Sequence, residues 1–291
     1  MKQAIAKTDV LIEALPYIQQ FKNRIVVIKY GGSSIEEESL DGGVLGDVVF
    51  MAAVGMLPLL VHGGGKHISR RLKEAGIESS FIQGLRVTDE RAIKVVEKVL
   101  VEDVNAPIVE KLKEFGCDAV ALSGKTGSMI RVEKMTGADE QGNPVDWGFV
   151  GTVKRVNPRP LFDVLLKSQV PVVAPMGVDD DGNVYNVNAD TVAAEIAASL
   201  TAEKLVYLTD VPGILRDKQD ESSLISTIRA DEVPELIREG IIAGGMLPKV
   251  EACLGALRNN VRKTHIISAK VPHSLLLEIF TDKGIGTEFI R

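Results

Sequence analysis

The chain has 291 residues, of which 45% are hydrophobic and 25% are charged, a balance typical of a globular protein with a large core. Its formal net charge of −6 disfavours a broad nucleic-acid surface, because binding a phosphate backbone needs clustered positive charge. No stretch reaches the roughly 18 uncharged apolar residues of a membrane-spanning helix, and the N-terminus carries no apolar targeting segment. We therefore expect a cytoplasmic protein whose partners include neither nucleic acid nor a membrane.

The first predicted element is a helix over Thr8–Phe21, ahead of the first core strand. Thr8 can cap this helix. Its apolar side chains share one stripe, made of Val10, Leu11, Ala14, Ile18 and Phe21. Pro16 lies inside the helix and predicts a kink, because proline removes a backbone hydrogen bond. The stripe has to pack either on the body of the same chain or on another subunit, and the residues alone leave both open.

Six apolar runs then alternate with amphipathic segments. The runs predict strands at Ile25–Lys29, Leu57–His62, Asp118–Ser123, Val170–Pro175, Leu205–Thr209 and Thr264–Ser268. The helical patterns cover Asp89–Phe115, Pro160–Ser168, Asp190–Ser199, Ala230–Glu239 and Met246–Asn259. Several runs are continuous Val, Ile and Leu, which is typical of strands covered on both faces. The alternation predicts an α/β fold with a mainly parallel sheet between two layers of helices.

The segment Ser128–Val153 departs from this alternation, because glycine and polar residues separate short β-like pieces. It predicts an antiparallel hairpin that projects from the sheet. No Gly/Ser/Pro-rich linker divides the chain. Any two lobes should therefore share one sheet, with a seam near Leu200–Lys204.

Two glycine-rich turns follow buried strands and precede helical segments, namely Gly31-Gly32 and Gly63-Gly64-Gly65. Such turns expose backbone N–H groups at a helix start, where the helix dipole favours anions such as phosphate. Two turns of this kind predict more than one phosphate contact. We expect a phosphorylated small molecule as the ligand.

Three familiar motifs are incomplete in this chain. Ala119–Thr126 would be a Walker A loop only if residue 119 were Gly. His62–Gly65 is similar to a lipase oxyanion loop, but the chain has no G-x-S-x-G nucleophile elbow. The G-x-G-x-x-G fingerprint of nicotinamide enzymes is absent too. The sequence thus disfavours these three classes of enzyme.

Charged residues near glycine turns are candidates for phosphoryl transfer, which needs positioning and charge neutralisation more than covalent help. Lys29 ends the first strand and Lys249 follows another glycine-led helix start, although either could be a solvated charge. Asp190 opens a helix and could be its N-cap, a role that can coexist with a catalytic one. Arg86 lies between apolar residues, so its guanidinium needs a carboxylate or phosphate from a ligand or from an internal salt bridge.

From about Ile25 to Ile290, the chain resembles the amino acid kinase family. The motifs that carry the resemblance are Lys29-Tyr30-Gly31-Gly32, Val61-His62-Gly63-Gly64-Gly65, Gly84-Leu85-Arg86-Val87-Thr88, Leu122-Ser123-Gly124-Lys125, Gly148-Phe149-Val150-Gly151, Tyr185-Asn186-Val187-Asn188-Ala189-Asp190, Leu208-Thr209-Asp210-Val211-Pro212-Gly213-Ile214-Leu215 and Gly244-Gly245-Met246-Leu247-Pro248-Lys249. The combination of G-L-R-V-T with N-V-N-A-D is highly specific, whereas a glycine pair alone would be a weak signal.

The resemblance implies a three-layer α/β/α sandwich over residues 23–291 that uses ATP with Mg²⁺. Residues 23–200 would form the acyl-amino-acid-binding lobe and residues 201–291 the nucleotide-binding lobe. The likeness is strong to members that phosphorylate the γ-carboxylate of N-acetyl-L-glutamate in arginine biosynthesis. The alternatives are a sister kinase acting on another carboxylate or a carbamate, and a non-catalytic arginine-sensing scaffold.

The resemblance also assigns roles to single residues. Lys29 and Lys249 would neutralise charge on the transferring phosphoryl group, and Asp190 would orient both lysines. The residues expected to bind the substrate are Gly31, Gly32, Gly63, Gly64, Gly65, Arg86, Asn186 and Asn188. Those expected to bind the nucleotide are Thr209, Asp210, Gly213, Leu215, Gly245 and Met246. No protein metal site and no general base are expected, because ATP holds the Mg²⁺ and the γ-carboxylate is already ionised at pH 7.

Regulation is a further implication of the resemblance. Arginine-inhibited members of the family carry a leading helix that interlaces dimers into a homohexamer, and residues 1–22 resemble that helix. Arginine is therefore expected as an effector, bound by Tyr17, His273, Glu278, Gly284 and Gly286. The Glu278 carboxylate would accept hydrogen bonds from the guanidinium. The alternative is a simple helical extension with a structural His273.

Overall fold

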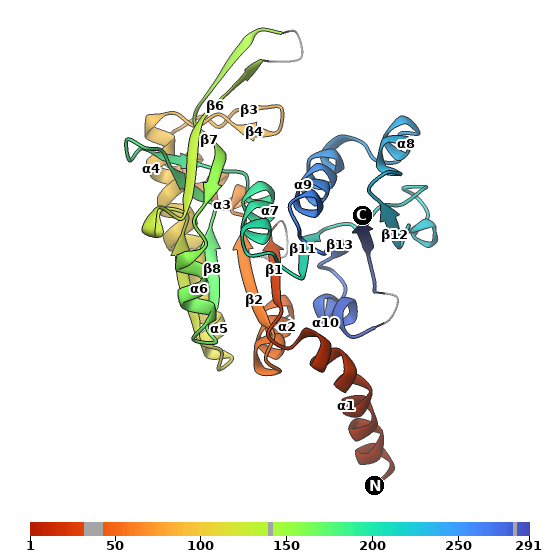
Figure 1. The fold of residues 1–291 in the computed structure, drawn as a ribbon. Coiled ribbons are helices and arrows are strands. Elements are labelled where there is room, and N and C mark those ends of the chain that lie inside the picture. Colours follow the sequence, from red (N-terminus) through yellow and green to blue (C-terminus); the bar gives the residue numbers. More distant parts are fainter. Residues whose placement is uncertain (32–42, 139–141, 282–283) are drawn as a thin grey trace.

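A computed structural model describes residues 1–31, 43–138, 142–281 and 284–291. At its centre is an eight-stranded sheet in the order β12-β14-β13-β11-β1-β2-β8-β5 (Figure 1). Six neighbouring strands are parallel, namely β13 (Lys263–Ser268), β11 (Lys204–Thr209), β1 (Ile25–Tyr30), β2 (Leu57–His62), β8 (Val170–Ala174) and β5 (Ala119–Ser123). They are the six predicted strands, each within one residue of its expected boundaries.

The two remaining strands of the sheet lie at one edge. β14 (Thr287–Ile290) is antiparallel to β13 and parallel to β12 (Thr227–Arg229). Neither strand was predicted, because each is short and lacks a long apolar run.

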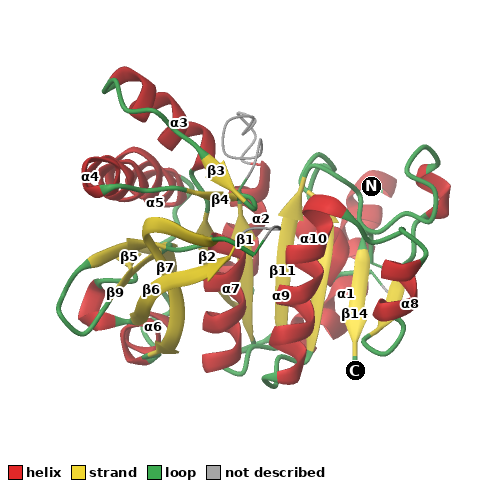
Figure 2. Cartoon of the chain, turned by 90° about the horizontal axis from the view of Figure 1, so that it is seen from above, coloured by secondary structure: helices red, strands yellow, loops and turns green. Residues whose placement is uncertain are grey.

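Alternate residues of the central strands face two separate hydrophobic layers. Val27 of β1 belongs to one layer, while Val26 and Ile28 belong to the other. The first layer contains α6 (Arg159–Leu165), α7 (Ala189–Ser199), α8 (Val233–Arg238) and α9 (Leu247–Arg258). The second contains α2 (Gly43–Ala53), α3 (Gly65–Glu74), α4 (Glu90–Lys98), α5 (Ala106–Glu114) and α10 (Ser274–Ile279). Figure 2 shows helices on both sides of the sheet, and the predicted α/β/α sandwich is confirmed.

The segment predicted as one long helix is divided by a π-helical turn. α4 ends at Lys98, a π-helix covers Val99–Asn105, and α5 follows. Pro107 stands at the start of α5 and has no N–H to continue an α-helical ladder. The wider π turn therefore precedes the residue that an uninterrupted α-helix would accommodate least well.

The predicted hairpin is present and belongs to a small barrel. β6 (Ile130–Ala138) pairs antiparallel with β7 (Pro144–Val156), with register shifts along the ladder. β9 (Met176–Val178) and β10 (Val184–Asn186) close the barrel, which the sequence did not predict. β3 (Phe81–Ile82) and β4 (Leu85–Arg86) form a separate two-stranded hairpin.

The leading helix, α1 (Lys2–Phe21), begins earlier than predicted, so Thr8 lies inside it and is not its cap. The helix is continuous through Pro16. It projects from the body (Figure 1), and its C-terminal end contacts the body, with Phe21 buried and the Tyr17 ring 6.2 Å from that of Phe280. Val10, Leu11 and Ile12 are each more than 60% exposed. Of the predicted apolar stripe, Val10 and Leu11 are thus exposed, while Ala14 and Ile18 are half-buried and Phe21 is buried.

The proposed seam near Leu200–Lys204 does not interrupt the sheet. β1 pairs in parallel with β11 along Val26–Lys29 and Lys204–Tyr207. In the part of the chain that the structure describes, no helix is long and apolar enough to cross a membrane.

Candidate active site

Three strand ends and two helix starts meet at one edge of the sheet. In β1, Lys29 is in register with Val61 of β2 on one side and with Tyr207 of β11 on the other. Because the three strands are parallel, their carboxyl ends lie at the same edge, where ligands bind in open α/β sheets. The glycine turns therefore start beside the ammonium group of Lys29.

Asp190 brings the two predicted lysines together. Its Oδ1 lies 3.1 Å from Lys29 Nζ and its Oδ2 lies 2.5 Å from Lys249 Nζ. Asp190 stands in the first turn of α7 and Lys249 in the first turn of α9. The N-cap of α7 is Asn188, whose Oδ1 accepts from the N–H groups of Asp190 and Thr191. The expectation that Asp190 itself caps the helix was wrong, and its carboxylate is left to hold the two ammonium groups.

The charges of this triad are strongly coupled. Burial lowers the pKa of the Lys29 ammonium, and the nearby Lys249 lowers it further, although Asp190 opposes both. Burial would raise the pKa of the Asp190 carboxyl, but the two lysines outweigh it and the pKa is lowered. Asp190 is therefore ionised at neutral pH. With both lysines protonated, the triad carries one net positive charge in a site that is largely shielded from water.

Tyr207 supports the triad and was missed by sequence reasoning. Its hydroxyl donates to the backbone carbonyl of Asp190 at 3.0 Å. The side chain is fully buried on β11. A tyrosine within an apolar strand reads as an ordinary core residue, so the sequence carried no signal for this contact.

The two glycine turns are in contact. A Cβ on Gly31 would lie 2.8 Å from Lys29 Nζ and 3.5 Å from the Gly63 nitrogen, so a side chain there would displace the ammonium group. The Gly63 N–H donates to Tyr30 O at 2.8 Å. The Gly63 N–H is therefore already bonded in this structure and does not point to a phosphate, as had been expected. Gly64 and Gly65 begin α3 and retain the favourable position of helix N-terminal amides. Gly32 lies outside the described residues.

Arg86 lies at the far side of the second glycine turn. It is buried, with Nη2 donating to Gly65 O at 3.0 Å and to Ser69 Oγ at 2.8 Å, and Nη1 donating to Ser79 Oγ. Its Cζ is 4.5 Å from the centre of the Phe81 ring, and burial lowers the pKa of its guanidinium. Among the described residues, no carboxylate forms a salt bridge with Arg86. The internal salt bridge that was left open is thus not found there.

The two asparagines of the predicted substrate set occupy different positions. Asn186 ends β10, in register with Met176 of β9. Asn188 lies two residues further on and uses its side-chain oxygen to cap α7. Its direct role is therefore to hold the first turn of the helix that carries Asp190.

A cleft of about 450 Å³ lies beside the start of α9, the helix that carries Lys249. It is lined by Asp210, Val211, Pro212, Gly213, Ile214, Leu215, Lys218, Glu221, Ile241, Ala243 and Met246. Four of the six predicted nucleotide residues belong to this lining. Thr209 and Gly245 do not: the Thr209 hydroxyl is buried and donates to Val211 O at 2.8 Å, and Gly245 lies next to Met246 in a short turn.

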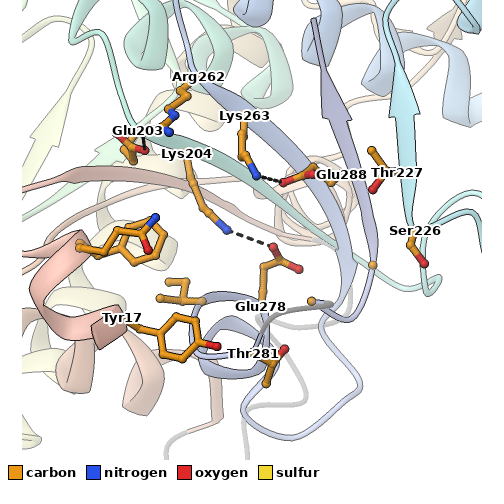
Figure 3. Close-up of a pocket in the computed structure, with 15 residues that line it drawn as sticks. Tyr17, Glu203, Lys204, Ser226, Thr227, Arg262, Lys263, Glu278, Thr281 and Glu288 are labelled. Carbon is orange, nitrogen blue, oxygen red and sulfur yellow. Dashed lines mark hydrogen bonds and ion pairs between the residues drawn. The ribbon is translucent and has the colours of Figure 1, made fainter. Parts of the chain in front are cut away.

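A second cavity of about 440 Å³ lies between α1 and the last strands. Its lining includes four of the predicted effector residues, namely Tyr17, Glu278, Gly284 and Gly286. Figure 3 shows that charged side chains surround it, and these were not predicted: Glu203, Lys204, Arg262, Lys263 and Glu288.

Glu278 is the most embedded acid of this cavity. Its Oε1 lies 3.2 Å from Lys204 Nζ and 2.8 Å from His265 Nδ1. Burial would raise the pKa of the Glu278 carboxyl, but the contacts with His265 and Lys204 outweigh it and lower the pKa to about 2. His273 is not part of the cavity lining. Its Nδ1 lies 2.8 Å from Asp47 Oδ1 on α2, a contact between residues too distant in sequence to be predicted.

The fold and the lysine–aspartate triad define a class of protein. The profile of the amino acid kinase family matches residues 24–268, and the chain belongs to this family. Among individual proteins, it is 50% identical to the acetylglutamate kinase of Heliobacterium modesticaldum, over 100% of both chains. It is also 50% identical to the acetylglutamate kinase of Moorella thermoacetica, over 97% of both chains.

Solved structures share the fold. N-acetylglutamate synthase from Neisseria gonorrhoeae, complexed with coenzyme A and N-acetyl-glutamate, matches 98% of this chain with a TM-score of 0.84 and 26% identity. The matched region spans 63% of that synthase. Carbamate kinase from Giardia lamblia, bound to AMP-PNP, matches 92% of this chain and 98% of that one with a TM-score of 0.63. At 14% identity, that likeness concerns the fold alone.

Proposed function

We propose that this chain transfers the γ-phosphoryl group of ATP to the γ-carboxylate of N-acetyl-L-glutamate, giving ADP and N-acetyl-L-glutamyl 5-phosphate. The observation that carries the proposal is the triad, in which one carboxylate holds two ammonium groups at a sheet edge. The identity of about 50% to acetylglutamate kinases over nearly the whole chain supports the choice of substrate.

The reaction needs little from the protein beyond positive charge and the correct placement of the two substrates. The attacking γ-carboxylate is ionised at neutral pH, so no side chain has to remove a proton. Negative charge is spread over the transferring phosphoryl group, and fixed cations in a shielded site stabilise it. Lys29 and Lys249 supply these cations, one toward the nucleophile and one toward the leaving group. Asp190 fixes both and cancels only one of the two positive charges.

Substrate recognition falls to Arg86 and the neighbouring polar groups. The guanidinium of Arg86 binds the α-carboxylate, since hydroxyl and carbonyl oxygens are its described hydrogen-bond partners and its charge remains to be matched. Asn186 and the Asn188 amide nitrogen donate to the same substrate. The amides of Gly31, Gly64 and Gly65 bind the reacting carboxylate and phosphoryl oxygens.

The nucleotide occupies the cleft between Asp210 and Met246. The apolar side chains of that cleft cover the base, and Met246 of its lining directly precedes the α9 helix that carries Lys249. Mg²⁺ is carried by the ATP phosphates and water. Residues 23–200 then act as the acceptor lobe and residues 201–291 as the nucleotide lobe, joined by the pairing of β1 with β11.

Arginine is proposed as a feedback inhibitor that binds the second cavity. Glu278 accepts from its guanidinium, and the lysines and arginine at the rim of the cavity attract its carboxylate. Tyr17 brings α1 into the same cavity. The exposed apolar stripe of α1 packs on a second subunit and links dimers into a cytoplasmic hexamer.

The reaction can be tested by trapping the acyl phosphate as a hydroxamate. N-acetyl-L-glutamate is compared with L-glutamate and L-aspartate, each with and without arginine. We expect a signal with N-acetyl-L-glutamate that arginine suppresses. A signal that arginine leaves unchanged would remove the regulatory proposal, and a signal only with another acceptor would point to a sister kinase.

A further inference from the structure

His62 is a buried histidine that the proposed reaction does not use. It ends β2, directly before the glycine triplet, and its side chain is fully inaccessible. Its Nδ1 lies 2.9 Å from Gly63 O, and its Nε2 lies 3.0 Å from Asn105 Nδ2. Because a carbonyl can only accept, Nδ1 carries the proton and Nε2 accepts from the asparagine. Burial lowers the pKa of His62 to about 4, so the ring is neutral at pH 7.

Asn105 lies at the end of the π-helical segment and is also buried. Its Nδ2 faces Val172 O at 2.9 Å and Leu122 O at 3.2 Å, in addition to His62. All three neighbours are acceptors, so the amide nitrogen must point toward them. One amide thus joins the backbones of β5 and β8 to the side chain at the end of β2. The π turn places it there, as such turns often do at functional sites.

The same π segment packs on the glycine turn itself. A Cβ on Gly64 would lie 2.6 Å from Leu100 Cδ2, so only glycine allows this approach. Gly63 is held on both sides, by its N–H to Tyr30 O at 2.8 Å and by its carbonyl to His62. In a trans peptide the N–H of Gly64 points away from the carbonyl of Gly63. Fixing that carbonyl therefore fixes the direction of the next amide, at the start of α3.

We propose that His62 and Asn105 are positioning residues that lock the Gly63–Gly64 peptide, so that the first amides of α3 are aimed at the reacting anion before it binds. The inference rests on the proposed carboxylate phosphorylation. The pair neither donates a proton to the substrate nor touches it. The pair acts by restricting the backbone conformations of the turn. A misplacement of reacting groups by about 1 Å can lower the rate on the order of 100-fold.

Two variants of His62 separate its two contacts. In His62→Asn, the amide nitrogen can take the place of Nδ1 and keep the bond to Gly63 O. In His62→Gln, the longer amide takes the place of Nε2, keeps the contact with Asn105 and releases Gly63. We expect His62→Gln, which releases Gly63, to lower kcat by about 10- to 100-fold with little change in the KM for ATP, and His62→Asn, which loses only the support of Asn105, to lower kcat by less. The pH profile of kcat should keep its shape in both.

Hydrogen exchange provides a readout that does not depend on turnover. The amides of Gly63 and Ile68 are bonded to Tyr30 O and Gly64 O, so they report whether the turn is held. Exchange at both should accelerate more in His62→Gln than in His62→Asn. Val109→Ala, which trims a buried side chain of the same layer on α5, is the matched control. It should lower the unfolding temperature and leave kcat and exchange at the turn unchanged.

The possible outcomes are distinct. Equal losses of kcat and stability in both His62 variants, with unaltered exchange at the turn, would show a purely structural histidine and overturn the proposal. Loss of one limb of the pH profile would show a proton-transfer role and overturn it too. If the wild type forms no acyl phosphate, the proposed function fails, and the exchange measurement alone decides whether the pair holds the turn.

Discussion

At the scale of single residues, the site depends on one carboxylate that is shared by two cations. Burial alone would favour the neutral form of Asp190 and the neutral amine of Lys29. The lysines favour the ionised Asp190 carboxylate, and that carboxylate in turn favours the Lys29 ammonium. Removal of one member therefore changes the charge and the geometry of the other two.

Asp190→Asn tests this dependence. The substitution keeps the size of the side chain but removes the charge between Lys29 and Lys249, which then repel one another. We expect kcat for acyl-phosphate formation to fall by about 100- to 1,000-fold. Asp180→Asn, at an exposed surface acid, should leave it unchanged. Normal turnover of the Asp190 variant, measured by hydroxamate trapping, would refute the assigned role.

Glu278 should give the protein a distinct acid sensitivity. Its pKa is about 2 in the folded chain and about 4.3 in an unfolded one. The ionised Glu278 carboxylate therefore makes its full contribution to folding stability above the pKa of the unfolded chain. That contribution is lost as the pH falls from there toward 2. The size of that contribution is on the order of 3 kcal/mol.

The measurement compares urea unfolding of the wild type and of Glu278→Gln from pH 7 to pH 3. The difference between their free energies of unfolding should be largest at neutral pH and shrink below about pH 4.3. A difference that stays constant over the whole range would show that the contacts with His265 and Lys204 do not lower the pKa of the Glu278 carboxyl.

At the scale of elements, α1 differs from every other helix described. Other amphipathic helices bury their apolar face in one of the two layers, but α1 leaves Val10, Leu11 and Ile12 exposed. Exposed apolar surface on a helix marks an interaction site. This exposure is the observation behind the proposed contact of α1 with a second subunit.

Deletion of residues 2–16 tests the role of α1 without removing Tyr17 or the buried Phe21. We expect the mass in solution to fall from that of a hexamer to that of a dimer, with catalysis retained and arginine inhibition weakened. Light scattering after size-exclusion chromatography gives the mass. A shortened chain that is still hexameric would contradict the proposal.

At the scale of the whole molecule, the sheet is continuous across the two proposed lobes. β1 from one lobe and β11 from the other lie side by side in its centre. Neither lobe can unfold without exposing the paired strand of the other. We expect a single cooperative unfolding transition in urea, in which the fluorescence of Trp147, the one tryptophan of the chain, coincides with the far-ultraviolet circular dichroism. Two separated transitions would show that the lobes are independent.

The sequence predicted the parts of the fold that local pattern controls. Continuous apolar runs identified the six parallel strands, and glycine turns identified the edge that holds Lys29. The barrel strands β9 and β10 were missed because each has three residues and pairs only after folding. The π turn was missed because its apolar spacing resembles that of an α-helix.

The residues of the site divide in the same way, into those that a local pattern identifies and those that it does not. Lys29, Asp190 and Lys249 were found because each stands at a recognisable turn or helix start. Tyr207, Asn105 and the contact between His273 and Asp47 were missed, because each joins segments far apart in the chain. The family resemblance could supply residue roles, but it could not supply these supporting contacts.

The short strand β11 has a consequence for communication within the molecule. Lys204 at its start contacts Glu278 in the second cavity, and Tyr207 reaches the backbone of Asp190. These two residues are three positions apart, which is about 10 Å along a strand. A strand held by neighbours on both sides cannot compress or bend over so short a length. β11 therefore places a lining residue of the second cavity and the support of the triad on one paired stretch of backbone.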